Sequence, residues 1–287
     1  MSPNSAAERR LQCGRFSLSL ERPRVMGVIN VTPDSFSDGG LLASSAAAVE
    51  HGRTLVEEGA DMLDVGGEST RPGAQPVSIE DELRRVVPVI EGLRDVGVPL
   101  SVDTSKPEVM RAALASGADM INDVAGFRAQ GAFESVAASA AAVCIMHMQG
   151  EPRTMQAHPL YTDVVREVGE YLEERARAAM AAGIAHERVV IDPGFGFGKT
   201  LDHNLELLRA LGALRARGWP VLAGLSRKSM LGKITGRETS QRVHASVAAA
   251  LMAVINGARI VRVHDVRATR DALDVYDAVS GIPRRVN

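Results

Sequence analysis

Short apolar runs alternate along this chain with longer segments in which apolar residues recur every three or four positions. Short runs bounded by glycine or polar residues predict buried strands, and the longer segments predict amphipathic helices. The predicted strands cover residues 25–29, 61–65, 99–102, 119–121, 142–146, 188–191, 220–225 and 259–261. The predicted helices cover residues 46–58, 78–95, 107–116, 161–182, 240–257 and 268–279.

Local signals support the ends of these elements. Gly59, Gly117 and Gly257 each stop a helix and lead directly into a strand. Ser78 is placed as an N-cap, with Asp81 at the third helical position. About eight strands alternating with helices imply a parallel sheet with right-handed crossovers. At 287 residues the pattern predicts an α/β fold, a single (β/α)8 TIM barrel, with an open doubly wound sheet as the alternative.

The N-terminal segment precedes this repeating pattern. Residues 1–12 are predicted to be a frayed leader, and weak alternation over 15–20 predicts a short strand or hairpin. We therefore divide the chain into a leader and hairpin (1–22) and a barrel (23–287). No linker rich in proline, glycine or serine divides the barrel into two domains.

Charge and composition exclude several classes of function. The formal net charge is −2 and aromatic residues make up 3% of the chain, which argues against a nucleic-acid groove, a stacking platform or a membrane-binding surface. The two cysteines, Cys13 and Cys144, form no CxxC pair and predict neither a disulfide framework nor a zinc site. With no apolar run of membrane-spanning length, we expect a soluble, cytoplasmic protein.

Every predicted strand ends in a polar residue. These residues are Asn30, Asp64, Asp103, Asn122, His147, Asp192, Lys228, and Arg262 with His264. Any one of them is explained equally well as a helix N-cap or a turn former. The whole set is not, because the carboxyl ends of barrel strands form the reaction face of this fold.

The strand-end residues sort by charge. The middle strands supply Asp103, Asn122 and Asp192, which suit a ligand rich in N–H donors, such as the edge of a nitrogen heterocycle. The last strands and the first loops supply cations and anion-binding groups: Arg227, Lys228, Ser229, Arg262, His264, Arg71 and Ser69. Cations after the seventh and eighth strands are typical of phosphate sites in barrels. The chemistry predicts a nitrogen heterocycle that carries a phosphate or diphosphate.

Three features resemble known functional motifs but do not match them. Residues 193–200 look like a P-loop, but Pro193 stands where that motif needs its first glycine. Residues 224–228 look like a nucleophile elbow, but Lys228 replaces the second glycine. The histidines lack the spacing of metal ligands, so a protein-bound zinc is not expected.

Six ordered segments together resemble the dihydropteroate synthases: 26–40, 64–73, 101–107, 192–199, 226–229 and 262–265. The resemblance runs from about residue 23 to about residue 279. It implies a TIM barrel, a homodimer and a step of folate biosynthesis. In that step p-aminobenzoate is joined to 6-hydroxymethyl-7,8-dihydropterin diphosphate, releasing diphosphate and 7,8-dihydropteroate. The family uses Mg²⁺ on the diphosphate and is the target of sulfonamides that imitate p-aminobenzoate.

The resemblance also implies roles for individual residues. It assigns the pterin pocket to Asp103, Asn122, Asp192, Lys228 and Met146. It assigns Mg²⁺ and diphosphate contacts to Asn30, Arg262 and His264, and substrate and p-aminobenzoate contacts to Thr70, Arg71, Ser229, Phe36 and Pro33. The implied mechanism is a substitution with SN1 character, in which Asp103, Lys228, Arg262 and His264 act on the reacting groups. Loops 31–40 and 66–74 would close to exclude water from the cation.

Other readings of the residues stay open at this point. A related pterin-binding methyltransferase would not use diphosphate, so Arg262→Ala would leave its ligand binding intact. A Schiff-base aldolase would use Lys228, which borohydride would trap with a carbonyl substrate. A non-enzymatic pterin-binding or scaffold protein would show no turnover. The alanine-rich segment 240–257 is predicted to be a packed helix or part of a subunit interface.

Overall fold

The computed structural model describes residues 10–31, 40–69, 75–151 and 154–282. Its strands are β1 (Arg10–Cys13), β2 (Phe16–Ser19), β3 (Arg24–Asn30), β4 (Met62–Gly66), β5 (Leu100–Asp103), β6 (Met120–Asp123), β7 (Ala142–Met146), β8 (Val189–Asp192), β9 (Leu222–Ala223) and β10 (Ile260–Val263). Its α-helices are α1 (Gly40–Glu57), α2 (Ile79–Leu93), α3 (Pro107–Ser116), α4 (Ala132–Ala137), α5 (Val164–Ala181), α6 (Leu201–Arg209), α7 (Leu211–Arg215), α8 (Ser229–Thr235), α9 (Val243–Ile255) and α10 (Val266–Val279). None of these described helices is long and apolar enough to span a bilayer.

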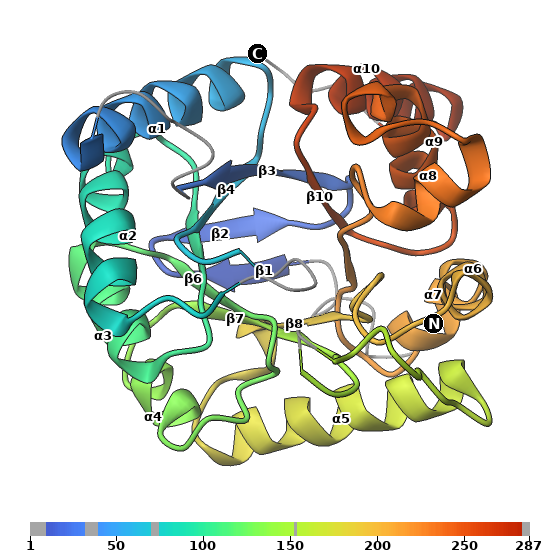
Figure 1. Cartoon of the computed structure of the whole chain (residues 1–287), viewed down its shortest axis with the longest axis horizontal. Helices are drawn as coiled ribbons and strands as arrows, with labels where there is room; N and C mark the ends of the chain where they lie inside the picture. Colours follow the sequence, from blue (N-terminus) through green and yellow to red (C-terminus); the bar gives the residue numbers. More distant parts are fainter. Residues whose placement is uncertain (1–9, 32–39, 70–74, 152–153, 283–287) are drawn as a thin grey trace.

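Eight parallel strands form the centre of the molecule, in the order β8-β7-β6-β5-β4-β3-β10-β9, and the helices surround them (Figure 1). A parallel bridge between Ile191, in β8, and Val221, beside β9, joins the two ends of this order. The strands therefore form a barrel rather than an open sheet, and the predicted (β/α)8 architecture is confirmed. Because β9 spans only Leu222–Ala223, the barrel is held by fewer ladder hydrogen bonds at this seam.

Successive side chains of each strand point alternately outward, toward the helices, and inward, into the barrel. Val25 and Ile29 of β3 point outward and pack with Leu55 of α1 in the main core. Met26 of the same strand and Met62 of β4 point inward and form part of a second apolar cluster. The interior is thus apolar where the strands begin, which leaves the polar residues of the same inward faces at the strands' carboxyl ends.

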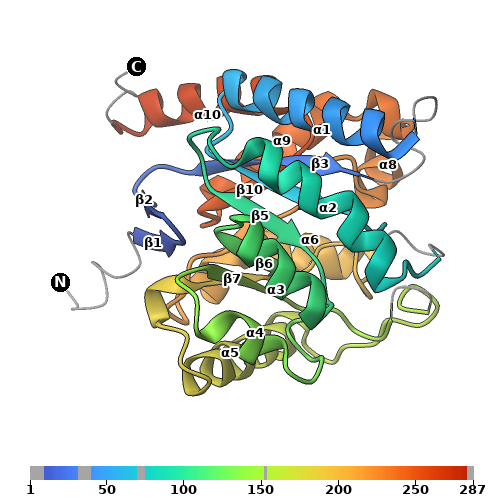
Figure 2. The ribbon, with the colours of Figure 1, turned by 90° about the vertical axis from the view of Figure 1, so that its left-hand side faces the viewer.

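The N-terminal hairpin closes the end of the barrel where the strands begin. β1 pairs with β2 in antiparallel register, and Figure 2 shows the hairpin at that end. Leu11, Cys13 and Leu20 are fully buried in the interior cluster. Arg15 holds the hairpin against the barrel by donating from Nε to Asp119 Oδ1 at 3.0 Å.

The predicted strand over 15–20 is confirmed as β2, but the frayed leader over 1–12 is wrong at residues 10–12, which lie in β1. Only Leu11 and Cys13 are apolar in that strand, and such a short alternation is a weak signal. The predicted cap of α2 is confirmed, since Ser78 Oγ accepts from the Asp81 amide at 3.1 Å. The division of the chain at residue 22 stays a prediction.

Candidate active site

The carboxyl ends of the strands bring predicted site residues together inside the barrel. The parallel register pairs Asp103 of β5 with Asn122 of β6, and Met146 of β7 with Asp192 of β8. All four are buried and belong to the inward-facing set of their strands. Asn30 ends β3 on the same side of the barrel and is partly exposed. The sequence placed these residues at strand ends, and closure of the barrel makes them neighbours.

The inward-facing polar residues at the carboxyl ends of the strands form one layer of the barrel interior. Asp64 and Arg262 link several members of this layer. Arg262 donates from Nε to Asp64 Oδ2 at 2.6 Å and from a terminal nitrogen to Asp103 Oδ2 at 3.1 Å. Asn122 also donates its amide to Asp64 Oδ2, at 3.1 Å. Asp64 is fully buried, and its Oδ1 has no hydrogen-bond partner among the described residues. One carboxylate therefore holds an arginine and an amide that were both predicted to contact substrate.

Burial shifts the protonation of the charged residues here. Burial raises the pKa of Asp103 to about 7, although the Arg262 charge opposes this shift. The pKa of Asp192 is also raised, mainly by burial. Burial would lower the pKa of Arg262, but the charges of Asp64 and Asp103 outweigh it and raise that pKa. The site thus holds a permanent cation beside a carboxyl that titrates near neutral pH.

Lys228 enters the layer from the segment after β9. Its Nζ donates to the backbone carbonyl of Phe195 and lies 4.5 Å from the centre of the Phe197 ring. Burial lowers the pKa of Lys228 to about 8, against the opposing charge of Asp192. The amine is therefore largely charged at neutral pH and is held over an aromatic face, which is a favourable cation–π arrangement.

The groups predicted to bind an anion divide into two sets. Arg262 and His264 both lie at the end of β10, and Ser226 Oγ lies 3.0 Å from His264 Nδ1. Ser226 also accepts from the His264 amide at 3.2 Å, which fixes the histidine backbone. Arg227 instead forms a two-point ion pair with Asp265, at 3.1 and 2.5 Å. The sequence grouped Arg227 with the anion-binding cations, and its pairing with Asp265 argues against that placement.

Ser229 begins α8 and is exposed. Pro33, Phe36, Thr70 and Arg71 lie outside the described residues, as do large parts of the two segments predicted to close over the site. Their assignments stay predictions.

The described residues of the site provide few ligands for a metal ion. Among the described residues, no cluster of three or more His, Cys, Asp or Glu side chains is arranged to hold a metal. Asn30 ends β3, at the carboxyl end of the barrel strands, and is partly exposed, and its side chain carries one amide oxygen. Mg²⁺ prefers oxygen ligands and usually takes only one or two from the protein when a substrate phosphate supplies the rest. These residues therefore suit a magnesium ion that arrives with a diphosphate.

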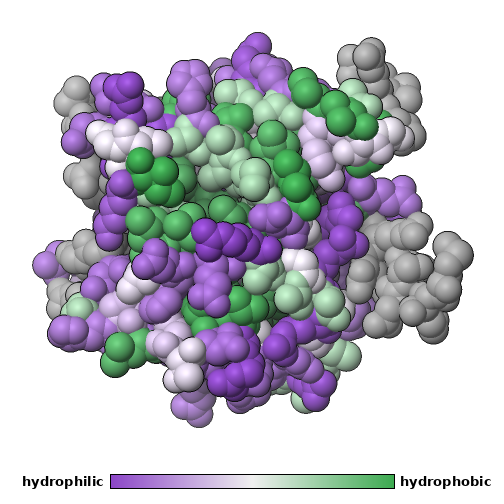
Figure 3. Space-filling model, turned by 90° about the vertical axis from the view of Figure 1, so that its right-hand side faces the viewer, coloured by the Kyte–Doolittle hydropathy of each residue, from purple (hydrophilic) through white to green (hydrophobic). Residues whose placement is uncertain are grey.

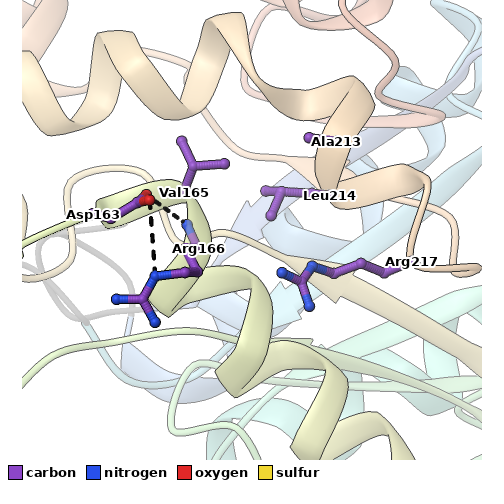
Figure 4. A pocket seen from close by; sticks show the side chains of 6 residues that line it. All are labelled: Asp163, Val165, Arg166, Ala213, Leu214 and Arg217. Carbon is purple, nitrogen blue, oxygen red and sulfur yellow. Dashed lines mark hydrogen bonds and ion pairs between the residues drawn. The ribbon is translucent and has the colours of Figure 1, made fainter.

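A surface pocket lies between α5 and α7 and has a volume of about 270 Å³ (Figure 4). Its two arginines are already paired. Arg166 contacts Asp163 and Glu170, and Arg217 contacts Glu173 at 2.5 Å. With its cations neutralised and no strand end nearby, this pocket has no reactive group to offer.

The carboxyl ends of the strands thus gather the buried carboxylates Asp103 and Asp192 and the amide of Asn122 beside the cations Lys228 and Arg262. Residues 26–264 match the family described as pterin binding enzyme. The chain belongs to the pterin-binding enzymes. Membership of this family agrees with the carboxylates and amide of β5, β6 and β8, which are suited to a ring rich in N–H donors.

Several members of the family are close to this chain in sequence and structure. The dihydropteroate synthase of Neisseria meningitidis serogroup C is 53% identical over 273 residues, covering 93% of this chain and 96% of its own length. The structure of the Xanthomonas albilineans dihydropteroate synthase with 4-aminobenzoic acid is 57% identical, with a TM-score of 0.90, covering 96% of this chain and all of that one. The Burkholderia cenocepacia dihydropteroate synthase complexed with 7,8-dihydropteroate is 54% identical, with a TM-score of 0.88, covering 95% and 96%.

Sequence reasoning missed some partners of the pterin-binding site. Asp64 was recognised as a strand-end residue but was given no role, although it holds Arg262 and Asn122. Ser226 was also missed. Its signal was its place directly after a predicted strand, next to Arg227 and Lys228.

Proposed function

We propose that this chain is a dihydropteroate synthase, which joins p-aminobenzoate to 6-hydroxymethyl-7,8-dihydropterin diphosphate and releases diphosphate and 7,8-dihydropteroate. The observation that carries the proposal is the interior layer in which Asp103, Asn122 and Asp192 lie on the same barrel face as Lys228 and Arg262. The layer occurs in a chain more than half identical to synthases over nearly its whole length.

The pterin ring fits the carboxylate side of this layer. Ring N–H and amino groups would donate to Asp192 and Asp103, each such charge-assisted bond contributing about 1.5–3 kcal/mol. Asn122 supplies both a donor and an acceptor, and Lys228 supplies a donor to a ring acceptor. Met146 belongs to an apolar cluster with Met148 and Met155, which would pack against the ring.

The reaction breaks the bond between the exocyclic methylene carbon and the diphosphate oxygen, and the electron pair leaves with the diphosphate. Arg262 and His264 would stabilise the charge that develops on the leaving group. The pterin ring delocalises the carbon cation, and an ionised Asp103 stabilises it electrostatically. The neutral amine of p-aminobenzoate then attacks and loses a proton, so the site needs no strong general base.

We propose that Asn30 contacts the magnesium ion carried by the diphosphate. The support is the partly exposed position of Asn30 at the carboxyl end of β3, its amide oxygen, and the preference of Mg²⁺ for oxygen ligands. Bound there, the ion would neutralise charge on the leaving diphosphate.

We further propose a homodimer formed through the face of α8, α9 and α10, the side shown in Figure 3. The exposed large apolar residues are Ile234 of α8, Met252 and Ile255 of α9, and Val275 and Val279 of α10. Exposed apolar surface often marks a protein–protein interface. Met252→Glu should convert a dimer into a monomer in sedimentation experiments, and an unchanged sedimentation coefficient would exclude this face.

We place the enzyme in the cytoplasm because its diphosphate substrate is too highly charged to cross a bilayer.

The decisive experiment is release of diphosphate by the purified protein with Mg²⁺ and the pterin diphosphate, with and without p-aminobenzoate. Release that needs both substrates and yields an equal amount of dihydropteroate establishes the synthase. Tight pterin binding without release would instead support a methyltransferase or a pterin-binding protein.

A further inference from the structure

The glycine-rich segment 193–200 directly follows Asp192 and does not match a phosphate-binding loop. It folds tightly onto the backbone that follows β7. Gly194 and Gly198 have φ values of +68° and +63°, and a Cβ on Gly194 would lie 1.9 Å from the carbonyl oxygen of His147. Only glycine allows this approach. The segment is therefore built to lie directly against its neighbour.

This segment contacts two residues of the site. The Gly194 amide donates to Asp192 Oδ1 at 2.7 Å, which orients that carboxylate. The carbonyl of Phe195 accepts from Lys228 Nζ, and the ring of Phe197 lies beneath the same amine. The position of Lys228 therefore depends on the conformation of segment 193–200.

Lys199 holds the segment from within. It is 3% exposed, and its Nζ donates to the Phe197 carbonyl at 2.9 Å and to the His147 carbonyl at 3.4 Å. The same Nζ lies 3.0 Å from His147 Nδ1. Burial lowers the pKa of His147 to about 3, so its ring is neutral and Nδ1 can accept. One buried amine thus ties the end of β7 to the residue that supports Lys228.

Two more side chains secure the same segment. Tyr161 donates its hydroxyl to the Gly198 carbonyl at 2.9 Å, and Asn204 Oδ1 accepts from the Gly196 amide at 2.7 Å. Backbone groups of Gly194, Phe195, Gly196, Phe197 and Gly198 are all hydrogen-bonded, which restricts the conformations open to the segment.

We infer that Lys199 is a positioning residue for the synthase reaction: it does not contact substrate, but it fixes Phe195 and Phe197 so that the Lys228 amine is held in place. The inference rests on the proposed synthase activity. Loss of the Lys199 amine leaves the buried carbonyl of His147 and the partly buried carbonyl of Phe197 without this donor, and the segment is expected to rearrange to satisfy them.

Lys199→Met tests this role because methionine has a similar length and no donor. We expect kcat/KM for the pterin diphosphate to fall about 10-fold to about 100-fold, the usual effect of misplacing a site group by an ångström. Lys233→Met is the matched control, since Lys233 is an exposed lysine in α8, and it should behave like the wild type.

A double-mutant cycle separates positioning from general destabilisation. The affinity for 6-hydroxymethyl-7,8-dihydropterin is measured calorimetrically for Lys199→Met, Lys228→Met and the double variant. If Lys199 acts through Lys228, the double variant binds no more weakly than Lys228→Met alone. Fully additive losses, or a Lys199→Met variant as active as Lys233→Met, would overturn the inference.

Tyr161→Phe provides a milder variant if Lys199→Met does not fold, because it removes one bond to the same segment from a partly exposed side chain. Its smaller loss of affinity should also vanish in the Lys228→Met background, and a loss that persists there contradicts the inference. A wild-type protein that forms no dihydropteroate would refute the synthase itself. An active wild type with an unaffected Lys199→Met refutes only the positioning role.

Discussion

Asp64→Asn is the substitution that most directly tests how the site is held together. Asp64 is fully buried and is the shared acceptor for Arg262 and Asn122. Asparagine keeps the shape of the side chain and removes its charge. Both donors bond the same oxygen, Oδ2, so the asparagine oxygen can still accept from both, but neither bond then has a charged acceptor. The new amide NH₂ takes the place of Oδ1, which has no partner among the described residues, and so adds a buried donor without an acceptor.

The size of the effect follows from these two bonds. The partly buried Arg262–Asp64 bond, at 2.6 Å, is worth about 1.5–3 kcal/mol, and the Asn122 bond about 0.5–1.5 kcal/mol. Relief of repulsion between Asp64 and Asp103 offsets part of the loss. We expect the free energy of unfolding to fall by about 2 kcal/mol. A loosened Arg262 should lower kcat/KM about 100-fold.

Urea unfolding and steady-state kinetics measure the two effects. Glu170→Gln is the control, because it neutralises a carboxylate that pairs with Arg166 on the exposed surface, where such pairs contribute about 0–1 kcal/mol. For Asp64→Asn, a free energy of unfolding within about 0.5 kcal/mol of the wild type, together with a kcat/KM within twofold, would refute the view that Asp64 organises the site.

The same variant has a signature in its pH dependence. The pKa of Asp103 is about 7, so pterin binding to its ionised form should strengthen as pH rises through that value. Asp64 raises the pKa of Asp103 through its charge and also shares Arg262 with it. Asp64→Asn removes both effects and should move the acid limb of the binding profile to lower pH. Movement to higher pH would contradict the electrostatic argument.

Three further predictions concern the ligands. Asp192→Ala should weaken binding of 6-hydroxymethyl-7,8-dihydropterin about 10-fold to 100-fold in calorimetry, since a charge-assisted acceptor is lost, and unchanged affinity would remove Asp192 from the pterin pocket. Arg262→Ala should weaken binding of the pterin diphosphate more than binding of the same pterin without diphosphate; equal losses would favour a methyltransferase-like site. Removal of Mg²⁺ with EDTA should abolish diphosphate release and added MgCl₂ should restore it, whereas activity that survives chelation would exclude the metal.

The fold was largely predictable because its signals are local and repeated. Each strand is a short apolar run that stops at a polar residue, and α3 (Pro107–Ser116) has the bounds that its proline and glycine predict. Closure of the barrel could not be predicted from such local patterns. It depends on the bridge between Ile191 and Val221 and on the two-residue strand β9, which is set by tertiary packing and not by a local pattern.

The candidate site was predictable where a side chain is short and its direction follows from the strand. Asp103, Asn122 and Asp192 lie where inward-facing strand ends must lie. Long side chains were harder, because a sequence does not say where their charged ends turn. Arg227 was grouped with the anion-binding residues but pairs with Asp265, while Lys199 reaches back to the end of β7.

The N-terminal hairpin closes the barrel at the end where the strands begin. With Leu11, Cys13 and Leu20 filling the space where the strands begin, substrates and products share one doorway, at the opposite end. If the pterin binds at the buried Asp192 and Asn122, as we propose, it has to enter before the second substrate and cannot leave past it. With a single entrance, the molecule that binds last has to leave first, and a ligand that stays bound near the entrance prevents release of any molecule bound further inside.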